Sequence, residues 1–204
     1  MIGIIDYGLG NIKAFENIYH KLNIPVKRLR HAEDFTDITH LILPGVGAFD
    51  HAMQSFNDSG MREATESFVL IKKIPVIGIC VGMQMLAKCS EEGVLPGLSW
   101  IDGLVKKFDE NKIKDNTHLP HMGWNDVEVN TANPLFRGFL SVAKFYFLHS
   151  YYFEPLQEKD SIATSVYGVN FTCAVNKENI FGVQFHPEKS HEFGIRLLEN
   201  FSKI

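Results

Sequence analysis

The sequence predicts an α/β fold in which helices flank a mostly parallel central sheet and antiparallel strands are added in the C-terminal half. In the first half, short apolar runs alternate with segments whose apolar residues recur at helical spacing. Residues 75–84 combine both patterns as strand, tight turn and helix. The second half is rich in the apolar and aromatic runs typical of strands. Because 204 residues with 45% hydrophobic content can bury one core, and no Gly/Ser-rich or Pro-rich linker divides them, we expect one domain over residues 1–204.

The elements of the first half follow one another as strand and helix. Residues 2–5 form an apolar strand, and residues 6–11 form a turn. Helical spacing then places on one face the residues Phe15, Ile18, Tyr19 and Leu22. Pro25 ends this helix. The further elements of this half are strands at residues 26–29 and 39–43 and amphipathic helices around residues 49–56 and 61–71.

Residues 75–84, which read Pro-Val-Ile-Gly-Ile-Cys-Val-Gly-Met-Gln, carry the most informative pattern in the chain. A short apolar strand leads into a Gly-x-Cys-x-Gly turn centred on Cys80, and good helix formers occupy residues 83–88, as in a nucleophile elbow. A helix N-terminus favours the thiolate: lowering a thiol pKa from about 8.5 to about 7 raises the thiolate fraction at neutral pH from roughly 3% to roughly 50%, worth about 1.6 kcal/mol. Taken alone, the stretch also fits a buried core cysteine between two packing glycines.

A second glycine-rich turn, Pro-Gly45-Val46-Gly47, follows the strand at residues 39–43. Glycines adopt backbone conformations that other residues resist, so amide groups at this turn can point toward a ligand as an oxyanion hole or an anion-binding nest. An ordinary strand-to-helix turn is the alternative that the sequence leaves open.

The second half is expected to consist mainly of strands. A strand at residues 101–108 precedes a charged, exposed excursion at residues 109–116. Residues 120–125, Pro-His-Met-Gly-Trp-Asn, are expected to form a loop in which Trp124 either anchors a protein interface or is half-buried against the chain. The remaining elements are strands at residues 145–152, 162–167, 172–176 and 180–185 and a final helix with Phe193, Leu197, Leu198 and Phe201 on one face.

The strand at residues 180–185 runs into His186-Pro187-Glu188. Residues two apart in an extended segment point to the same side, so the Glu188 carboxylate can orient the His186 imidazole. Together with a cysteine on an elbow, this pair supplies the nucleophile, the base and the orienting group of acyl transfer through a thioester. Taken separately, His186 also fits a structural histidine, and Glu188 fits a partner for a helix dipole.

The composition limits the classes of partner. The formal net charge is -4, and no run of Lys or Arg is longer than a pair, so the sequence has no basic patch typical of binding to nucleic acid or anionic lipid. We therefore expect proteins and small molecules as partners. Because Met1 is followed by an apolar strand without a basic leader, and no apolar run approaches membrane-spanning length, we expect a soluble, cytoplasmic protein. Three cysteines, Cys80, Cys89 and Cys173, suit a reducing compartment and argue against a disulfide framework or a cysteine-rich zinc site.

Six motifs carry a family resemblance. Those that resemble the class I, triad-type glutamine amidotransferases are Gly-Ile-Cys80-Val-Gly-Met-Gln, Pro44-Gly-Val-Gly and Gln184-Phe-His186-Pro-Glu188-Lys-Ser. Those that narrow the resemblance to the glutaminase subunits of imidazole glycerol phosphate synthase, in histidine biosynthesis, are Asp6-Tyr-Gly-Leu-Gly-Asn11, Pro120-His-Met-Gly-Trp-Asn125 and Leu148-His-Ser-Tyr-Tyr152. The resemblance spans nearly the whole chain and implies the single flavodoxin-like amidotransferase domain of that family.

The resemblance implies a mechanism. Cys80 would attack the carboxamide carbon of L-glutamine, His186 would accept the thiol proton and later protonate the departing ammonia, and Glu188 would position His186. The amides that would hold the oxyanion are those of Val81 and one of Gly45, Val46 and Gly47. Neither a cofactor nor a metal ion is implied.

The same resemblance assigns the surroundings of the reacting atoms. The pocket for the amino-acid part of glutamine would be formed by Gln84, Glu92, His149, Ser150 and Tyr151. The surface that faces the partner subunit would include Asn11, Met122, Trp124 and Asn125. That partner is a HisF-like (β/α)₈ barrel cyclase subunit, which forms a heterodimer with the glutaminase and accepts ammonia through its interior.

The turn at residues 44–47 is also the expected point of regulation. An oxyanion donor is worth about 2.7 to 4 kcal/mol, more than the thiolate gain given above. We therefore hypothesise that the glycines of this turn rotate a carbonyl out and an amide in when the partner subunit is ready.

Three alternatives stay open. A paralogous glutaminase would supply ammonia to a barrel-type synthase in surface-sugar or other nitrogen-transfer pathways, and Val81 after the nucleophile departs from the family's commoner sequence. A non-catalytic binding module on the same fold is expected where the nucleophile is lost, whereas here the nucleophile, base and orienting carboxylate are all present. A cysteine peptidase or chaperone with a similar elbow leaves the Pro44 turn and the His-Pro-Glu stretch unexplained.

Overall fold

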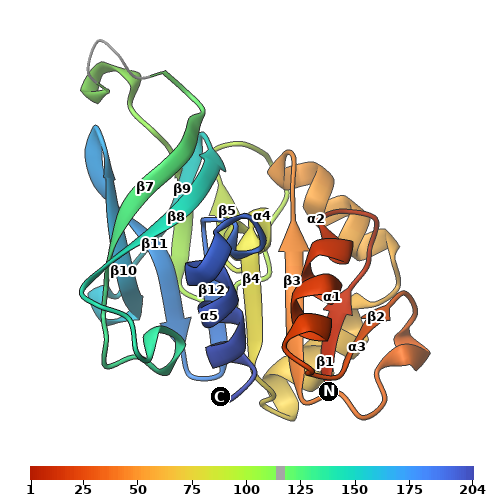
Figure 1. Ribbon diagram of the computed structural model, residues 1–204. Helices are drawn as coiled ribbons and strands as arrows, with labels where there is room; N and C mark the ends of the chain where they lie inside the picture. Colours follow the sequence, from red (N-terminus) through yellow and green to blue (C-terminus); the bar gives the residue numbers. More distant parts are fainter. Residues whose placement is uncertain (114–117) are drawn as a thin grey trace.

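A central mixed sheet organises the protein. The computed structural model describes residues 1–113 and 118–204, and within them the sheet has nine strands in the order β2-β1-β3-β4-β12-β11-β10-β7-β8 (Figure 1). The strands at the β2 end are parallel, and those at the β8 end are antiparallel. The predicted α/β class, with a mostly parallel centre and antiparallel additions, is therefore confirmed.

The parallel half of the sheet is covered on both faces. Its strands are β1 Ile2–Ile5, β2 Val26–Leu29, β3 His40–Gly45, β4 Val76–Cys80 and β12 Ile180–Val183. Every residue of β1, β4 and β12 is buried, as expected for parallel strands between two layers of helices. In Figure 1, the near face is covered by α1 Ile12–Lys21 and α5 His191–Phe201, and the far face by α2 Phe49–Asp58 and α3 Arg62–Glu66.

The antiparallel half comes from the second part of the chain. Its strands are β7 His121–Val129, β8 Val142–His149, β10 Ser161–Tyr167 and β11 Val169–Lys177. A small second sheet contains β5 Cys89–Ser90, β6 Gly103–Lys107 and β9 Tyr151–Pro155. Buried aromatic rings fill the core beside β8, where Phe145 stacks on Phe185 with ring centroids 3.9 Å apart.

The helix after Cys80 is shorter than the sequence predicts. α4 spans only Val81–Gln84, although helix formers continue through residue 88. The carbonyl oxygens of residues 85–88 accept hydrogen bonds from the backbone amides of residues 97–101. Because a longer helix would need the same carbonyls for its own later amides, the returning segment replaces it.

Three further elements differ from the prediction. Residues 120–125 do not form a loop, because β7 begins at His121 and pairs with β8 from its first residue. The strand predicted at 145–152 is divided at Ser150, where the chain leaves the large sheet and enters the small one. The helix predicted at 61–71 continues after α3 as a π-helical turn, Ser67–Ile71. In each of the first two cases, pairing with a strand remote in sequence decides the conformation.

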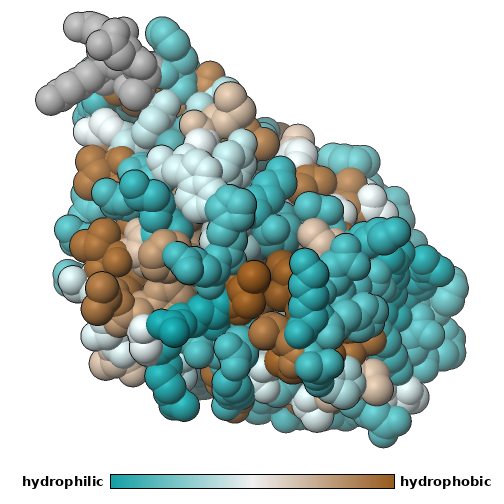
Figure 2. Space-filling model, viewed as in Figure 1, coloured by the Kyte–Doolittle hydropathy of each residue, from teal (hydrophilic) through white to brown (hydrophobic). Residues whose placement is uncertain are grey.

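The excursion predicted at residues 109–116 is exposed over residues 109–112, which include a short 3₁₀ turn at Glu110–Lys112. Residues 114–116 of that prediction lie outside the described residues. The face seen in Figure 2 is largely hydrophilic, with its hydrophobic residues gathered in the centre and on the side of the antiparallel strands. Across the described ranges, none of the helices combines the length and the apolar character needed to span a lipid bilayer.

Candidate active site

Cys80 occupies a strained elbow between β4 and α4. Its backbone has φ 56° and ψ −113°, a conformation that residues with a side chain rarely adopt. A Cβ atom on Gly78 would lie 2.5 Å from the carbonyl oxygen of Gly82, and a Cβ atom on Gly82 would overlap the carbonyl oxygen of Leu43. The two glycines therefore let α4 pack directly onto β4 and β3. The predicted strand, turn and helix around Cys80 are confirmed.

A cavity of about 320 Å³ opens beside this elbow. It is lined by Val46, Gly47, Cys80, Val81, Gln84, Glu92, Pro120, Leu148, His149, Ser150, Tyr151 and His186. Cys80 is only 3% exposed, yet its side chain borders this cavity, so it is not sealed in the core between the glycines. Of the residues predicted for the reaction and for glutamine, Gly45 and Glu188 lie behind this lining.

His186 and Glu188 form a buried pair at the cavity. The His186 Nδ1 atom lies 2.9 Å from Glu188 Oε1, and both side chains are almost inaccessible to solvent. The intervening backbone is a 3₁₀ turn, Pro187–Lys189, where the sequence suggested an extended segment. This turn nevertheless places the Glu188 carboxylate within hydrogen-bond distance of the His186 imidazole.

The pKa of His186 is set by its burial and by its neighbours Cys80 and Glu188. Burial alone lowers the pKa of this imidazole, but hydrogen bonds to the Cys80 sulfur and the Glu188 carboxylate, together with their negative charges, raise it to about 10. The imidazole therefore holds a proton firmly when it lies between a thiolate and a carboxylate. This is the state that a nucleophilic thiolate requires.

Two glutamine side chains connect the sulfur to the cavity wall. The Gln184 Nε2 atom lies 3.8 Å from Cys80 Sγ, and its Oε1 accepts a hydrogen bond of 3.1 Å from Gln84 Nε2. Gln84 also donates to the Tyr151 carbonyl oxygen at 3.1 Å. Gln184 was not predicted as a site residue, although its position two residues before His186 on one strand end was a usable signal.

The turn after β3 meets the elbow through backbone contacts. Val46 and Gly47 border the cavity, whereas Gly45 ends β3 and lies against the backbone of Gly82, where a Cβ would overlap. Gly47 has φ 85°, the left-handed region that glycine tolerates. Val46 and Gly47 of this turn thus border the same cavity as Cys80.

Tyr7 holds the start of the same turn. Its hydroxyl donates a hydrogen bond of 2.6 Å to the Pro44 carbonyl oxygen, and burial raises its pKa well above the usual range, which keeps the hydroxyl a donor. Gly10 lies on the other side, where a Cβ would be 2.6 Å from Pro44 Cβ. Pro44 is thereby held at the start of the turn. Tyr7 was missed because its partner is 37 residues away.

Glu92 is anchored at the cavity rim. Its carboxylate accepts a hydrogen bond of 2.9 Å from the Phe49 amide at the start of α2. Burial raises the pKa of this carboxyl, the amide lowers it, and the neighbouring Asp50 charge raises it again. The carboxylate is thus oriented toward the cavity by a helix N-terminus.

Sequence comparisons agree with this site. A family model described as glutamine amidotransferase class-I matches residues 3–204. A protein of Bdellovibrio bacteriovorus named imidazole glycerol phosphate synthase subunit HisH is 56% identical over 204 residues, which is 100% of both chains. The chain belongs to the HisH family of class I glutamine amidotransferases. A HisH of Leptospira interrogans is 48% identical, and a protein named HisH 2 of Pseudomonas aeruginosa is 44% identical, each over 100% of both chains.

Solved structures show the same fold at lower identity. A crystal structure of a glutamine amidotransferase has a TM-score of 0.73 at 20% sequence identity and covers 98% of each chain. A putative GMP synthase protein of Thermoplasma acidophilum has a TM-score of 0.71 at 20% identity, over 98% of this chain and 90% of that one. The fold of this HisH-family chain is therefore shared with amidotransferases of different titles.

Of the residues predicted to face a partner, Met122 is the one that the sheet register connects to the cavity. Met122 and Trp124 are 65% and 44% exposed on β7, and Asn125 is half-buried. Met122 is opposite Leu148 in the sheet register, and Leu148 borders the cavity, so this apolar surface reaches the pocket. Asn11 is exposed at the start of α1.

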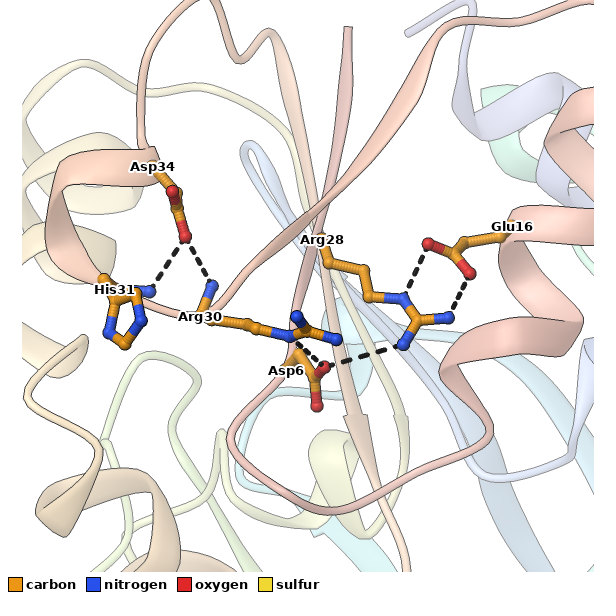
Figure 3. Close-up of polar contacts among 6 residues, drawn as sticks. All are labelled: Asp6, Glu16, Arg28, Arg30, His31 and Asp34. Carbon is orange, nitrogen blue, oxygen red and sulfur yellow. Dashed lines mark hydrogen bonds and ion pairs between the residues drawn. The ribbon is translucent and has the colours of Figure 1, made fainter.

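Charged residues fix the turn that leads to Asn11. Asp6, at the end of β1, accepts a hydrogen bond of 3.3 Å from Arg30 and lies 4.0 Å from Arg28, which also pairs with Glu16 of α1 (Figure 3). Asp34 accepts hydrogen bonds from the backbone amides of Arg30 and His31. These contacts connect β1, β2 and α1 around the turn.

Gly82→Ala is expected to destabilise the fold, because its methyl group would overlap the Leu43 carbonyl. We expect the free energy of unfolding, measured by urea denaturation, to fall by at least about 3 kcal/mol. Gly60→Ala is the matched control: that glycine has φ 71° and open space around its Cβ position, so only the backbone cost of about 1 kcal/mol applies. Equal losses in the two variants would contradict the close approach at the elbow.

Stability should fall as the pH drops from about 6.5 toward 4 because of two buried histidines. Burial lowers the pKa of His121 to about 4, and burial assisted by repulsion from His121 lowers that of His149 to about 3. The unfolded chain therefore binds more protons than the folded chain in this window. The free energy of unfolding falls by about 1.4 kcal/mol per extra proton for each pH unit. The contribution of His186 has the opposite sign and another window, since it is lost as the pH rises from 6.5 toward 10.

The measurement is the urea midpoint between pH 6.5 and 5. His121→Gln should flatten its pH dependence because one of the two titrating groups is removed. His51→Gln, at an exposed position of α2, should leave the dependence as it is. An unchanged slope in His121→Gln would show that these imidazoles do not titrate on unfolding.

Proposed function

We propose that this HisH-family chain is the glutaminase subunit of imidazole glycerol phosphate synthase, which hydrolyses L-glutamine and passes the ammonia to a synthase subunit in histidine biosynthesis. The observation that carries the proposal is the shared cavity of the Cys80 elbow and the His186–Glu188 pair. Full-length relatives named HisH, at 44% to 56% identity, support the pathway. No cofactor or metal ion is needed for this reaction.

Hydrolysis proceeds through a thioester. The Cys80 thiolate attacks the carboxamide carbon, forming the carbon–sulfur bond, while His186 holds the thiol proton. His186 then protonates the departing nitrogen as the carbon–nitrogen bond breaks, which releases ammonia. Water then attacks the thioester carbon and gives a proton to His186. The carbon–sulfur bond breaks, which releases glutamate and regenerates Cys80. Glu188 keeps the imidazole oriented through both steps.

The oxyanion of each tetrahedral intermediate requires backbone donors. Val81, next to the nucleophile, would supply one amide from the start of α4, and Gly45, Val46 or Gly47 would supply the other. Each donor is worth about 2.7 to 4 kcal/mol, so this turn controls more of the barrier than thiolate formation does. We hold the turn to be the regulated element, with Tyr7 and Gly10 as its fixed base.

Glutamine would enter with its amide at the sulfur and its amino-acid end toward the rim. The Glu92 carboxylate suits the substrate's ammonium group. The other groups of this subsite are Gln84, His149, Ser150 and Tyr151.

The partner would be a HisF-like (β/α)₈ barrel synthase that forms a cytoplasmic heterodimer with this chain and carries out the lyase step. Its contact surface here would include Asn11, Met122, Trp124 and Asn125. Ammonia in neutral water is mostly ammonium, which cannot attack. Direct passage through the barrel interior preserves the nucleophilic form.

Cys80→Ser should abolish glutamine-dependent synthesis in the complex, lowering the rate at least about 1,000-fold, because the oxygen nucleophile is not activated by this site. Synthesis from added ammonia should persist, since the partner does that chemistry. Cys89→Ser, at an exposed cysteine, is the matched control and should keep both activities. The assay uses the histidine-pathway ribonucleotide intermediate, and the absence of an imidazole product with the wild-type pair would refute the pathway.

Partner binding should accelerate both glutamine turnover and alkylation of Cys80 by a glutamine analogue, because it completes the oxyanion turn. Trp124→Ala should raise the partner concentration needed for half-maximal acceleration about tenfold, as a truncated interface anchor does. Leu140→Ala, at a residue 82% exposed outside the proposed surface, should not. Equal rates with and without the partner would end the proposal that the turn is regulated.

A further inference from the structure

Two buried histidines outside the His186 pair lie next to one another beneath the cavity wall. The His121 Nδ1 atom is 3.0 Å from His149 Nε2, and both residues are almost fully buried. His149 borders the cavity, whereas His121 does not. The glutamine reaction described above gives His121 no task.

Aromatic rings enclose these imidazoles. Phe147 and Tyr167 stack on His121, with centroids 4.6 and 4.1 Å away and interplanar angles of 22°. Phe108 and Phe171 each lie with their ring centroids 5.4 Å from that of His149. Because apolar rings take the place of water, the histidine nitrogens depend on their protein hydrogen bonds.

Backbone groups at the two ends determine which nitrogens carry protons. The Tyr151 carbonyl, 2.7 Å from His149 Nδ1, can only accept, so Nδ1 of His149 carries its proton and Nε2 accepts. His121 must then donate from Nδ1 to His149 and accept at Nε2. The atom 3.1 Å from that Nε2 is Asn125 Nδ2, which donates.

The orientation of the Asn125 amide is fixed independently. Its Nδ2 donates to the Val166 carbonyl at 2.9 Å, and its Oδ1 accepts from the Asp126 amide at 2.8 Å. A flipped amide would lose both bonds. Every donor in the series therefore points the same way, and an extra proton on either imidazole would set two N–H groups against each other.

The series ends on groups that contact the reaction site. The Tyr151 carbonyl accepts from His149 and also from Gln84, and Gln84 donates to Gln184, whose amide nitrogen lies beside Cys80 Sγ. Displacement of that carbonyl would move Gln84 and, through it, Gln184. The position of the Tyr151 carbonyl in the pocket wall thus depends on its hydrogen bond from His149. Through His149 it also depends on His121, which does not border the cavity.

We propose that Asn125, His121 and His149 form a one-directional hydrogen-bond relay between neutral imidazoles, and that His121 is a positioning residue for glutamine through the Tyr151 carbonyl. The proposal rests on the glutaminase function for its kinetic consequence, but the tautomers are a property of the folded chain alone. Each histidine has its proton on Nδ1 and accepts a hydrogen bond at Nε2.

The first test is ¹⁵N NMR of the imidazoles in the full-length wild-type chain at neutral pH. We expect both His121 and His149 to be neutral and protonated at Nδ1, assigned by His121→Asn and by His149→Asn. A proton on Nε2 of either residue would overturn the relay. This readout does not require glutamine turnover, so it separates the relay from the proposed function.

The second test is glutamine kinetics in the saturated complex with the synthase subunit. His121→Phe keeps an aromatic ring but removes both hydrogen bonds, and it should raise KM for glutamine about tenfold with a smaller change in kcat. His121→Asn, whose amide can donate to His149 from the place of Nδ1, should recover most of the loss. Tyr167→Phe is the matched control: it keeps the ring that stacks on His121 but removes the hydroxyl that donates to the His118 carbonyl. It should leave KM for glutamine unchanged.

Two outcomes separate the claims. An unchanged KM in a folded His121→Phe variant would overturn the positioning role, whatever the tautomers are. A wild-type complex without glutamine turnover would instead overturn the proposed function and leave the NMR result standing. If His121→Phe fails to fold, the KM of His121→Asn against that of His121→Leu decides the positioning role.

Discussion

The close approach of three backbone segments at the elbow is the constraint on which the site depends. Gly82 lies against the Leu43 carbonyl, and Gly45 lies against the Gly82 amide, so α4 begins in contact with the end of β3. This packing forces Cys80 into a positive φ and brings the sulfur out beside the turn at residues 44–47. A side chain at either glycine would push the start of α4 away from the end of β3.

The sheet register brings the other reacting groups to the same place. β4 lies between β3 and β12 with all three parallel, so their carboxyl ends meet at one edge. Gly45 is opposite Cys80, and Val183 is opposite Ile79, which leaves His186 three residues past the paired strand. Cys80 and His186 are 106 positions apart in the sequence, and the parallel register of their strands brings them to one cavity.

The sequence was sufficient where the pattern is local. Strand periodicity and the Gly-x-Cys-x-Gly spacing predicted β4 and its elbow, since the contact of Gly78 with the Gly82 backbone lies within five residues. The length of α4 and the strand at His121 were not predictable, because amides of residues 97–101 and the pairing with β8 decide them. Tyr7 and His121 escaped for the same reason: each acts through a hydrogen bond to a residue at least 28 positions away.

The surroundings of two histidines at the cavity shift their pKa values in opposite directions. Cys80 and Glu188 raise the pKa of His186, whereas His149 has a carbonyl and an imidazole as hydrogen-bond partners and is surrounded by aromatic rings. A charge on His149 would also repel a charged His186, which lowers the pKa of His149 further. Of these two imidazoles, His186 is therefore the one whose surroundings favour a bound proton. His149 at the cavity and His121 beside it are both buried among aromatic rings, which disfavours a charge on either imidazole.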